Sequence, residues 1–99
     1  MYEIHSNDDQ TLVVLSGSVS ISDVTPLRKE LQALDDSADL IIDASALDYI
    51  DSSGIACLIS AYSVRAKTGA KVFLKNPSDA LLRVLDTLKF ATLFPVLDQ

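Results

Sequence analysis

The sequence predicts one α/β domain, with a mixed, mostly parallel sheet of four or five strands forming a single pair of layers with three or four helices. Its 99 residues, 48% of them apolar, can bury one core, and we expect residues 1–99 to form a single domain. Strand-like and helical segments alternate after residue 20, which is typical of parallel strands joined by right-handed crossovers. Two strand-like segments separated by a turn indicate an opening β-hairpin.

The opening hairpin is predicted from residues 2–7 and 11–17, with turn-forming residues from Asn7 to Gln10 between them. Residues 12–15 are apolar without interruption. Such a run is typical of a strand that is covered on both faces. We therefore expect the second strand to lie inside the domain with packing on each side.

A first helix is predicted to begin near residue 23. Ser22 or Asp23 can cap it, and Pro26 is compatible with the first turn of a helix. Apolar residues then recur at helical spacing, at Val24, Leu27, Leu31 and Leu34. The acidic pair at residues 35–36 is unfavourable at the C-terminal end of a helix, so we expect the helix to stop before it.

A short buried strand is predicted for residues 39–44, and residues 45–50 are expected to connect it to the next helix. That helix, from Ser53 to about Lys67, has the clearest apolar period in the chain. Its apolar positions are Ile55, Leu58, Ile59, Tyr62 and Ala66. Gly69 is well placed to end the helix, because glycine readily adopts the left-handed conformation found there.

The last third of the chain predicts a strand at residues 70–75 and a helix capped by Asn76 or Ser78. The apolar side of that helix is formed by Leu81, Leu82, Leu85 and Leu88. Residues 93–97 are compatible with a short final strand. Pro95 would restrict that strand to the edge of the sheet, because proline cannot donate to a neighbouring strand.

Charge and composition exclude several classes of function. The formal charge of −6 argues against nucleic acid and anionic membrane surfaces, and favours partners with basic surfaces. No apolar stretch is long enough to cross a membrane, and the N-terminus does not resemble a signal peptide. Cys57 is the single cysteine and cannot form an internal disulfide. These observations predict a cytoplasmic protein without membrane insertion.

The chain offers little for catalysis, so we do not expect an enzyme or a cofactor. His5 is the single histidine and is interpreted as a surface residue of an edge strand. Cys57 is interpreted as a small core residue. One cysteine and one histidine cannot form the usual zinc site, and no glycine-rich phosphate loop is present.

Four carboxylates near predicted strand ends form the remaining candidate for ion chemistry. If they gathered in space they could bind Mg²⁺. The favoured interpretation is that they are caps and turn residues, because aspartate is common in both roles. The four residues are Asp23, Asp43, Asp48 and Asp51.

The most informative motif is Asp51-Ser52-Ser53-Gly54, between a strand-like segment and the long helix. Asp51 or Ser52 can act as a plain N-cap. The free N–H groups and the positive end of the helix dipole also make this turn favourable for a phosphate. We therefore interpret Ser52 as a phosphorylation site, with Ser53 as the weaker candidate, and we expect no metal there.

The stretch from Leu40 to Phe90 resembles the STAS domain of anti-sigma-factor antagonists. The pattern is an apolar strand, Asp-Ser-Ser-Gly, an apolar helix that ends near a glycine, another apolar strand and a further helix. The strand from Leu12 to Gly17 fits the opening of the same family. The resemblance covers nearly the whole chain and implies the STAS fold.

The resemblance also implies a role in partner switching. In that scheme a serine kinase related to histidine-kinase ATPases, which is also the anti-sigma-type partner, phosphorylates Ser52. A PP2C-type phosphatase removes the phosphate. The unphosphorylated domain binds the kinase, and the output is a sigma factor or another regulator of biofilm, secretion or stress genes. The partner surface is expected to include the Ser52 turn, the start of its helix and the loop at residues 18–25. The expected partner-binding residues are Ser20, Asp23, Tyr49, Asp51, Ser53, Gly54 and Ile55.

One position departs from the family pattern, and one alternative function stays open. Ser20 stands where the family usually has an aspartate, which puts partner choice or phosphorylation efficiency in doubt. The alternative is a constitutive STAS subunit of a cytoplasmic or lipid-transport ABC complex. Such subunits tend to carry Thr-Gly-Gly at the motif, unlike this chain. Nucleotide binding is a weaker hypothesis, because no phosphate loop is present.

Overall fold

The computed structural model describes residues 2–6, 10–35, 37–90 and 92–97. The described part contains five strands and three helices, and their order is the one predicted from the sequence. The elements are β1 (Tyr2–Ser6), β2 (Gln10–Val19), α1 (Val24–Gln32), β3 (Asp39–Ile50), α2 (Ser52–Thr68), β4 (Val72–Lys75), α3 (Asp79–Thr87) and β5 (Val96–Leu97).

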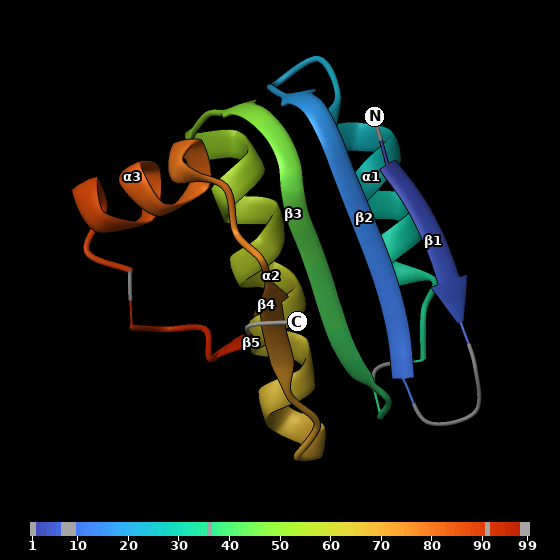
Figure 1. Cartoon of the computed structure of the whole chain (residues 1–99). Coiled ribbons are helices and arrows are strands. Elements are labelled where there is room, and N and C mark those ends of the chain that lie inside the picture. Colours follow the sequence, from blue (N-terminus) through green and yellow to red (C-terminus); the bar gives the residue numbers. More distant parts are fainter. Residues whose placement is uncertain (1, 7–9, 36, 91, 98–99) are drawn as a thin grey trace.

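The sheet has the strand order β1-β2-β3-β4-β5 (Figure 1). β1 and β2 are antiparallel, and each later neighbouring pair is parallel. The predicted mixed α/β fold with an opening hairpin is therefore confirmed. The predicted hairpin turn falls mainly on residues 7–9, which lie outside the described residues, while Gln10 already belongs to β2.

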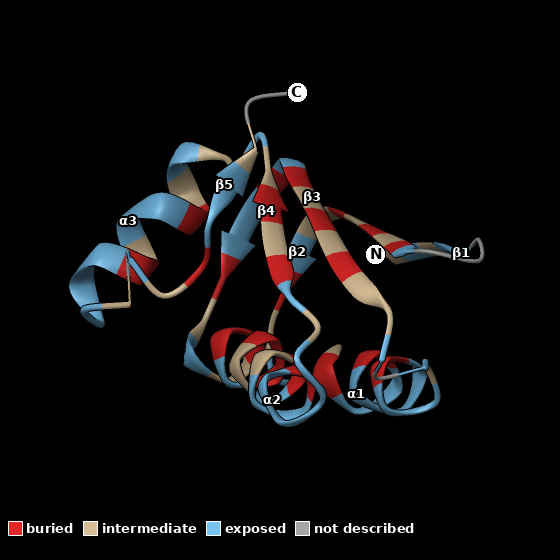
Figure 2. Cartoon of the chain, turned by 90° about the horizontal axis from the view of Figure 1, so that it is seen from below, coloured by how far each residue is buried: buried red, intermediate tan, exposed pale blue. Residues whose placement is uncertain are grey.

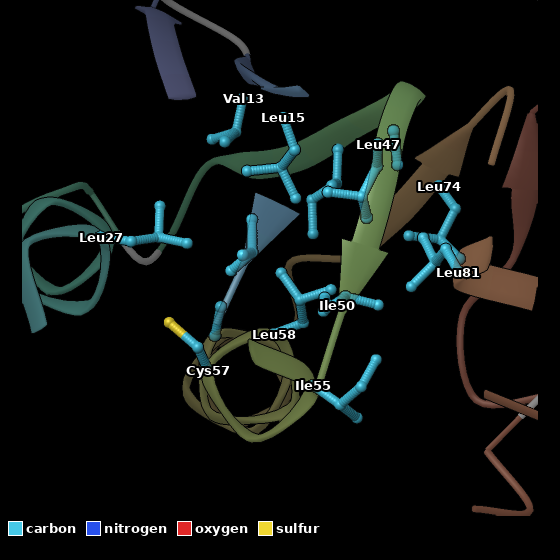
Figure 3. Packing of buried hydrophobic residues seen from close by; sticks show 14 of the residues in the cluster. Val13, Leu15, Leu27, Leu47, Ile50, Ile55, Cys57, Leu58, Leu74 and Leu81 are labelled. Carbon is cyan, nitrogen blue, oxygen red and sulfur yellow. The ribbon is translucent and has the colours of Figure 1, made fainter. Parts of the chain in front are cut away.

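The helices are arranged so that α1 and α2 lie side by side against one face of the sheet (Figure 2). α3 lies beyond the β4–β5 side and contributes Leu81 and Leu85 to the core. Leu81 packs near Leu74 of β4 (Figure 3). Among the described residues, none of the helices has the length and apolar character that a membrane span requires.

The prediction that β2 is covered on both faces was wrong. Val13 and Leu15 are buried, whereas Leu12 and Val14 on the other face are only partly buried. Within the described part, no helix covers that second face (Figure 2). Leu12 instead lies opposite Ile41, which lies opposite Phe73, so apolar side chains of neighbouring strands shield one another.

The prediction that residues 45–50 form a connector was also wrong, because β3 continues to Ile50. This part of β3 pairs with the end of β2, which runs beyond the predicted limit to Val19. Two register shifts interrupt the pairing, and Gly17, with a φ of 67°, lies at one of them. The buried positions are therefore spaced by three residues, at Ala44, Leu47 and Ile50. That spacing hides the alternation by which a strand is usually predicted.

The other boundaries lie close to the predicted ones. α1 ends at Gln32, before the acidic pair, and Gly69 ends α2 with a φ of 85°. Ser78 caps α3, since its hydroxyl accepts the N–H of Leu81 at 3.2 Å. β5 is restricted to the edge and is shorter than expected. Pro95 lies just before it, and its carbonyl accepts the N–H of Leu74.

The buried face of α2 differs from the apolar stripe read in the sequence. Cys57, expected in the core, is buried, and it faces α1 (Figure 3). Ala66 is exposed, and Arg65 is buried in its place, with 1% of its surface accessible. The Arg65 guanidinium donates to the carbonyls of Ala38, Ala61 and Asp35, at 3.1, 3.4 and 3.5 Å. Arg65 thereby ties α2 to the connection between α1 and β3.

We expect Arg65→Met to lower the free energy of unfolding by about 2–4 kcal/mol, because it leaves partly buried carbonyl groups without their donors. Arg65→Lys should fall between Met and wild type, since an ammonium cannot reproduce the planar set of donors. Urea denaturation measures both changes. The matched control is Lys67→Met on the exposed side of α2, which should change stability by less than about 0.5 kcal/mol. Equal effects of the two methionine variants would contradict the structural role of Arg65.

Candidate functional site

The predicted motif lies where two central strands end and the long helix begins. β2 and β3 run in parallel, and Val19 lies opposite Ile50 at their C-terminal ends. The loop after β2, residues 20–23, and the turn after β3 therefore lie close together beyond the C-terminal ends of these two strands, at the top of Figure 1. Ligand sites commonly form beyond the C-terminal ends of parallel strands.

Asp51 connects the start of α2 to the loop 20–23 through the two oxygens of its carboxylate. Oδ1 accepts the N–H groups of Ser53 and Gly54, at 3.0 and 3.2 Å, and the hydroxyl of Ser53. Oδ2 accepts the N–H of Ile21 at 3.2 Å, from a residue 30 positions earlier in the chain. Asp51 is thus the N-cap of α2, as predicted, and also a tie between that helix and the loop 20–23.

The surroundings of Asp51 keep its carboxylate ionised. The hydroxyl of Ser53 is the largest cause of a lowered pKa, and it acts against partial desolvation, which raises the pKa. The N–H groups of Gly54, Ile21 and Ser53 lower the pKa further. A carboxylate that accepts several N–H bonds is stabilised in its charged form.

The two serines of the motif differ in accessibility. Ser52 is exposed, and within the described residues its hydroxyl makes no hydrogen bond to the protein. The Ser53 side chain is partly buried, and its hydroxyl is bound to Asp51. A modifying enzyme would therefore reach the Ser52 hydroxyl more readily than that of Ser53.

Gly54 and Ile55 support the turn from inside the core. Both are buried, so the surface that either residue could offer to a partner is small. A Cβ on Gly54 would lie 2.6 Å from Ile50 Cγ1 and 3.1 Å from Val19 Cγ1. Only glycine lets the start of α2 approach the ends of β2 and β3 this closely.

The loop 20–23 is closed by its own hydrogen bonds. The Asp23 carboxylate accepts the N–H and the hydroxyl of Ser20, at 3.0 and 3.1 Å, and the N–H of Asp23 donates to the Ser20 carbonyl at 2.8 Å. The bond from the Ser20 N–H is the largest cause of the lowered pKa of Asp23. Asp23 stands at the N-cap position of α1, but its carboxylate turns back toward Ser20 instead of capping the helix.

Two exposed apolar side chains flank the motif. Ile21 is 75% exposed and Tyr49 is 54% exposed. Tyr49 was named as a candidate for contact, and Ile21 lies in the loop 18–25 that was expected at this surface, although it was not singled out. Its one signal in the sequence is an isolated isoleucine between two serines, outside any apolar period.

The remaining candidates lie in ordinary structural roles. His5 is exposed on β1. The Asp43 carboxylate accepts the N–H and hydroxyl of Ser45, at 3.1 and 2.8 Å, but both residues lie inside β3, so the predicted cap or turn role is wrong for Asp43. Asp48 is exposed. Across the described ranges, no group of three or more acidic, histidine or cysteine side chains could hold a metal ion.

We expect Gly54→Ala to destabilise the fold by about 1–3 kcal/mol, because its new methyl group overlaps the side chain of buried Ile50. The higher helix propensity of alanine offsets at most about 1 kcal/mol of that loss. Urea denaturation measures the net change. Ser63→Ala, on an exposed position of the same helix, is the control and should be neutral or slightly stabilising. A Gly54→Ala protein more stable than wild type would contradict this prediction and show that the Ile50 side chain moves to make room for the methyl group.

Asp51→Asn keeps one oxygen to cap α2, since asparagine caps helices about as well as aspartate. It removes the charge and also the second acceptor oxygen that binds the N–H of Ile21, and only the loss of the charge depends on pH. The pKa of Asp51 is lowered in the folded state from the ordinary 3.8, so its charge stabilises the fold above that value. The stability advantage of wild type over Asp51→Asn should be complete near neutral pH and decline as the pH falls below about 4. Urea denaturation across this range, with Asp48→Asn as control, measures the difference. A constant difference would contradict the assignment.

Comparison of the sequence with known proteins identifies the family of this chain. The family model described as "Mlab, STAS domain" matches residues 3–97. The anti-sigma-B factor antagonist of Bacillus subtilis (strain 168) is 27% identical over 85 residues, which cover 85% of this chain and 78% of that protein.

Two solved structures show the same fold. The unphosphorylated anti-sigma factor antagonist SpoIIAA has a TM-score of 0.83 at 15% identity, covering 100% of this chain and 90% of that one. The phosphorylated form of the Bacillus cell fate determinant SpoIIAA has a TM-score of 0.79 at 16% identity, covering 100% and 93%. With the family model matching nearly its whole length, the chain belongs to the STAS domain family.

Proposed function

We propose that this STAS domain is a phosphorylation-controlled binding regulator in a partner-switching pathway. Its unphosphorylated form binds a serine-kinase/anti-sigma-type ATPase, phosphorylation of Ser52 blocks that binding, and a PP2C-type phosphatase restores it. The observation that carries the proposal is the exposed Ser52 hydroxyl at the start of α2, beside a fully engaged Asp51. The relative named an anti-sigma-B factor antagonist, and SpoIIAA in unphosphorylated and phosphorylated forms, support the same role.

A phosphate on Ser52 would change the surface without unfolding the domain. It adds about −1.5 to −2 charges at neutral pH, and the start of a helix favours such an anion. The N–H groups of Ser53 and Gly54 are already bound to Asp51, so the phosphate would stand next to a second anion. A partner that covers this surface must then desolvate both, and like-charge contacts can cost several kcal/mol.

The proposed partner surface is narrower than the set predicted from the sequence. Asp51, Ser53, Tyr49, Ser20 and Asp23 stay as candidates for contact, while Gly54 and Ile55 act by holding the turn. Asp23 carries the carboxylate beside Ser20, the position where the family usually has aspartate. The proposed setting is the cytoplasm, because the kinase needs ATP. The role is binding and not catalysis, and the output is a sigma factor or another regulator of gene expression.

Paired baits test the proposal. Immobilised Ser52→Ala should retain an ATPase-type kinase from a native cell extract, and Ser52→Asp should lose it, with binding of the purified ATPase weakened at least about tenfold. Mass spectrometry identifies the retained proteins, and calorimetry with the purified ATPase gives the affinities.

Ser63→Asp is the matched control, since it places the same charge on an exposed position further along α2. It should retain the ATPase. Equal retention by Ser52→Ala and Ser52→Asp would refute the switch and favour a constitutive STAS subunit, in which Ser52 has no regulatory role.

A further inference from the structure

Ile21 is the most exposed large apolar side chain among the described residues. Its main chain is nevertheless fixed on both sides. The Ile21 N–H donates to Asp51 at 3.2 Å, and the bonds between Ser20 and Asp23 close the loop around it. Ile21 is therefore an apolar group held in one place and presented to solvent. Contact groups ordered in advance lose less conformational freedom on binding.

Tyr49 is the second exposed large apolar side chain near the motif. It lies opposite Ser18, near the end where β2 leads into the loop of Ile21. At about 3.3 Å per strand residue, Tyr49 is about 7 Å along the chain from Asp51, which in turn contacts the main chain of Ile21. We call segments 18–23 and 48–54, which carry these two exposed apolar side chains, the Ile21–Tyr49 patch. Asp51 joins the two segments through its bond to Ile21, and Ser52 directly follows Asp51.

The charges around the patch restrict what can cover it. Residues 18–23 and 48–54 contain three aspartates and no lysine, arginine or histidine. Asp51 is already bound to N–H groups, and Asp23 to Ser20, whereas Asp48 is exposed. A covering surface must therefore offer apolar side chains at its centre and neutral or basic groups facing Asp48, because facing acidic groups would repel it.

We propose that Ile21 is the apolar anchor through which the unphosphorylated domain docks into an apolar pocket on its partner protein. Tyr49, the second exposed apolar side chain, also contacts the partner, and Asp48 faces a basic side chain of that partner. The inference rests on the proposed function, since its partner is the ATPase proposed above. Phosphate on Ser52 blocks binding because it brings a hydrated dianion to the point where the pocket must exclude water around Ile21.

Affinity measurements with the purified ATPase retained by the Ser52→Ala bait test the anchor. Truncation of an interface anchor costs more than about 1 kcal/mol, so Ile21→Ala should weaken binding about tenfold or more. Leu82→Ala is the matched control, because Leu82 is a 41% exposed apolar residue on α3 and should change affinity less than about twofold. Unchanged circular dichroism should confirm that the exposed substitution leaves the fold intact.

A double variant separates the anchor from the switch. If both groups act on one contact, Ile21→Ala should add little loss in the Ser52→Asp background, so that the two effects are not additive. An unchanged affinity of Ile21→Ala while Ser52→Asp still lowers it would overturn the anchor and leave the switch standing. Equal affinities of Ser52→Ala and Ser52→Asp, or no retained ATPase, would overturn the proposed function and the anchor with it.

Sedimentation of the isolated chain tests whether a second copy covers the patch instead. The unphosphorylated wild-type domain should sediment as a monomer. A dimer that dissociates on Ile21→Ala would show that the patch is a self-association surface and would overturn the proposal.

Discussion

The arrangement of the site depends on the carboxylate of Asp51. One oxygen binds the start of α2 and the other binds the loop after β2, so two segments 30 residues apart are fixed by a single side chain. These bonds determine how the neighbouring side chains lie. The Ser53 hydroxyl donates to Asp51, the Ser52 side chain is exposed to solvent, and the main chain of Ile21 is fixed while its side chain is exposed. A different N-cap could begin the helix equally well, but serine or threonine would lack the second oxygen that holds the loop.

The core explains why this turn has to be so close to the sheet. Gly54 lies against Ile50 and Val19, the last residues of β3 and β2. Ile55 and Leu58 of α2 lie below Ile50 in the same cluster (Figure 3). The exposed Ser52 is therefore supported from inside by Gly54, two residues later, and by the branched apolar side chains on which Gly54 packs.

The sequence predicted the order of elements because most of them carry an undisturbed apolar period. The prediction failed where contacts with distant residues, and not the apolar period, determine which side chains are buried. Residues 45–50 were missed as a strand because the register shifts place Ala44, Leu47 and Ile50 three apart. Arg65 was missed because a buried cation looks like a surface residue until its carbonyl partners, from another part of the chain, are known. In the same way, the capping role of Asp51 is local and was predictable, whereas its bond to Ile21 is long-range and was not.

The amide hydrogen bonds of the two-residue strand β5 should open more readily than those of the site. Among the described residues, β5 pairs with Leu74 and Lys75 and accepts one further bond from Asn76, so its amide protons depend on few neighbours and should exchange with solvent through small local openings. The site instead lies on β2, β3 and α2, which hold most of the core and should exchange only on near-global unfolding. Local opening of β5 should therefore leave the bonds of Asp51 intact, and the surface at the start of α2 should keep its shape when β5 opens.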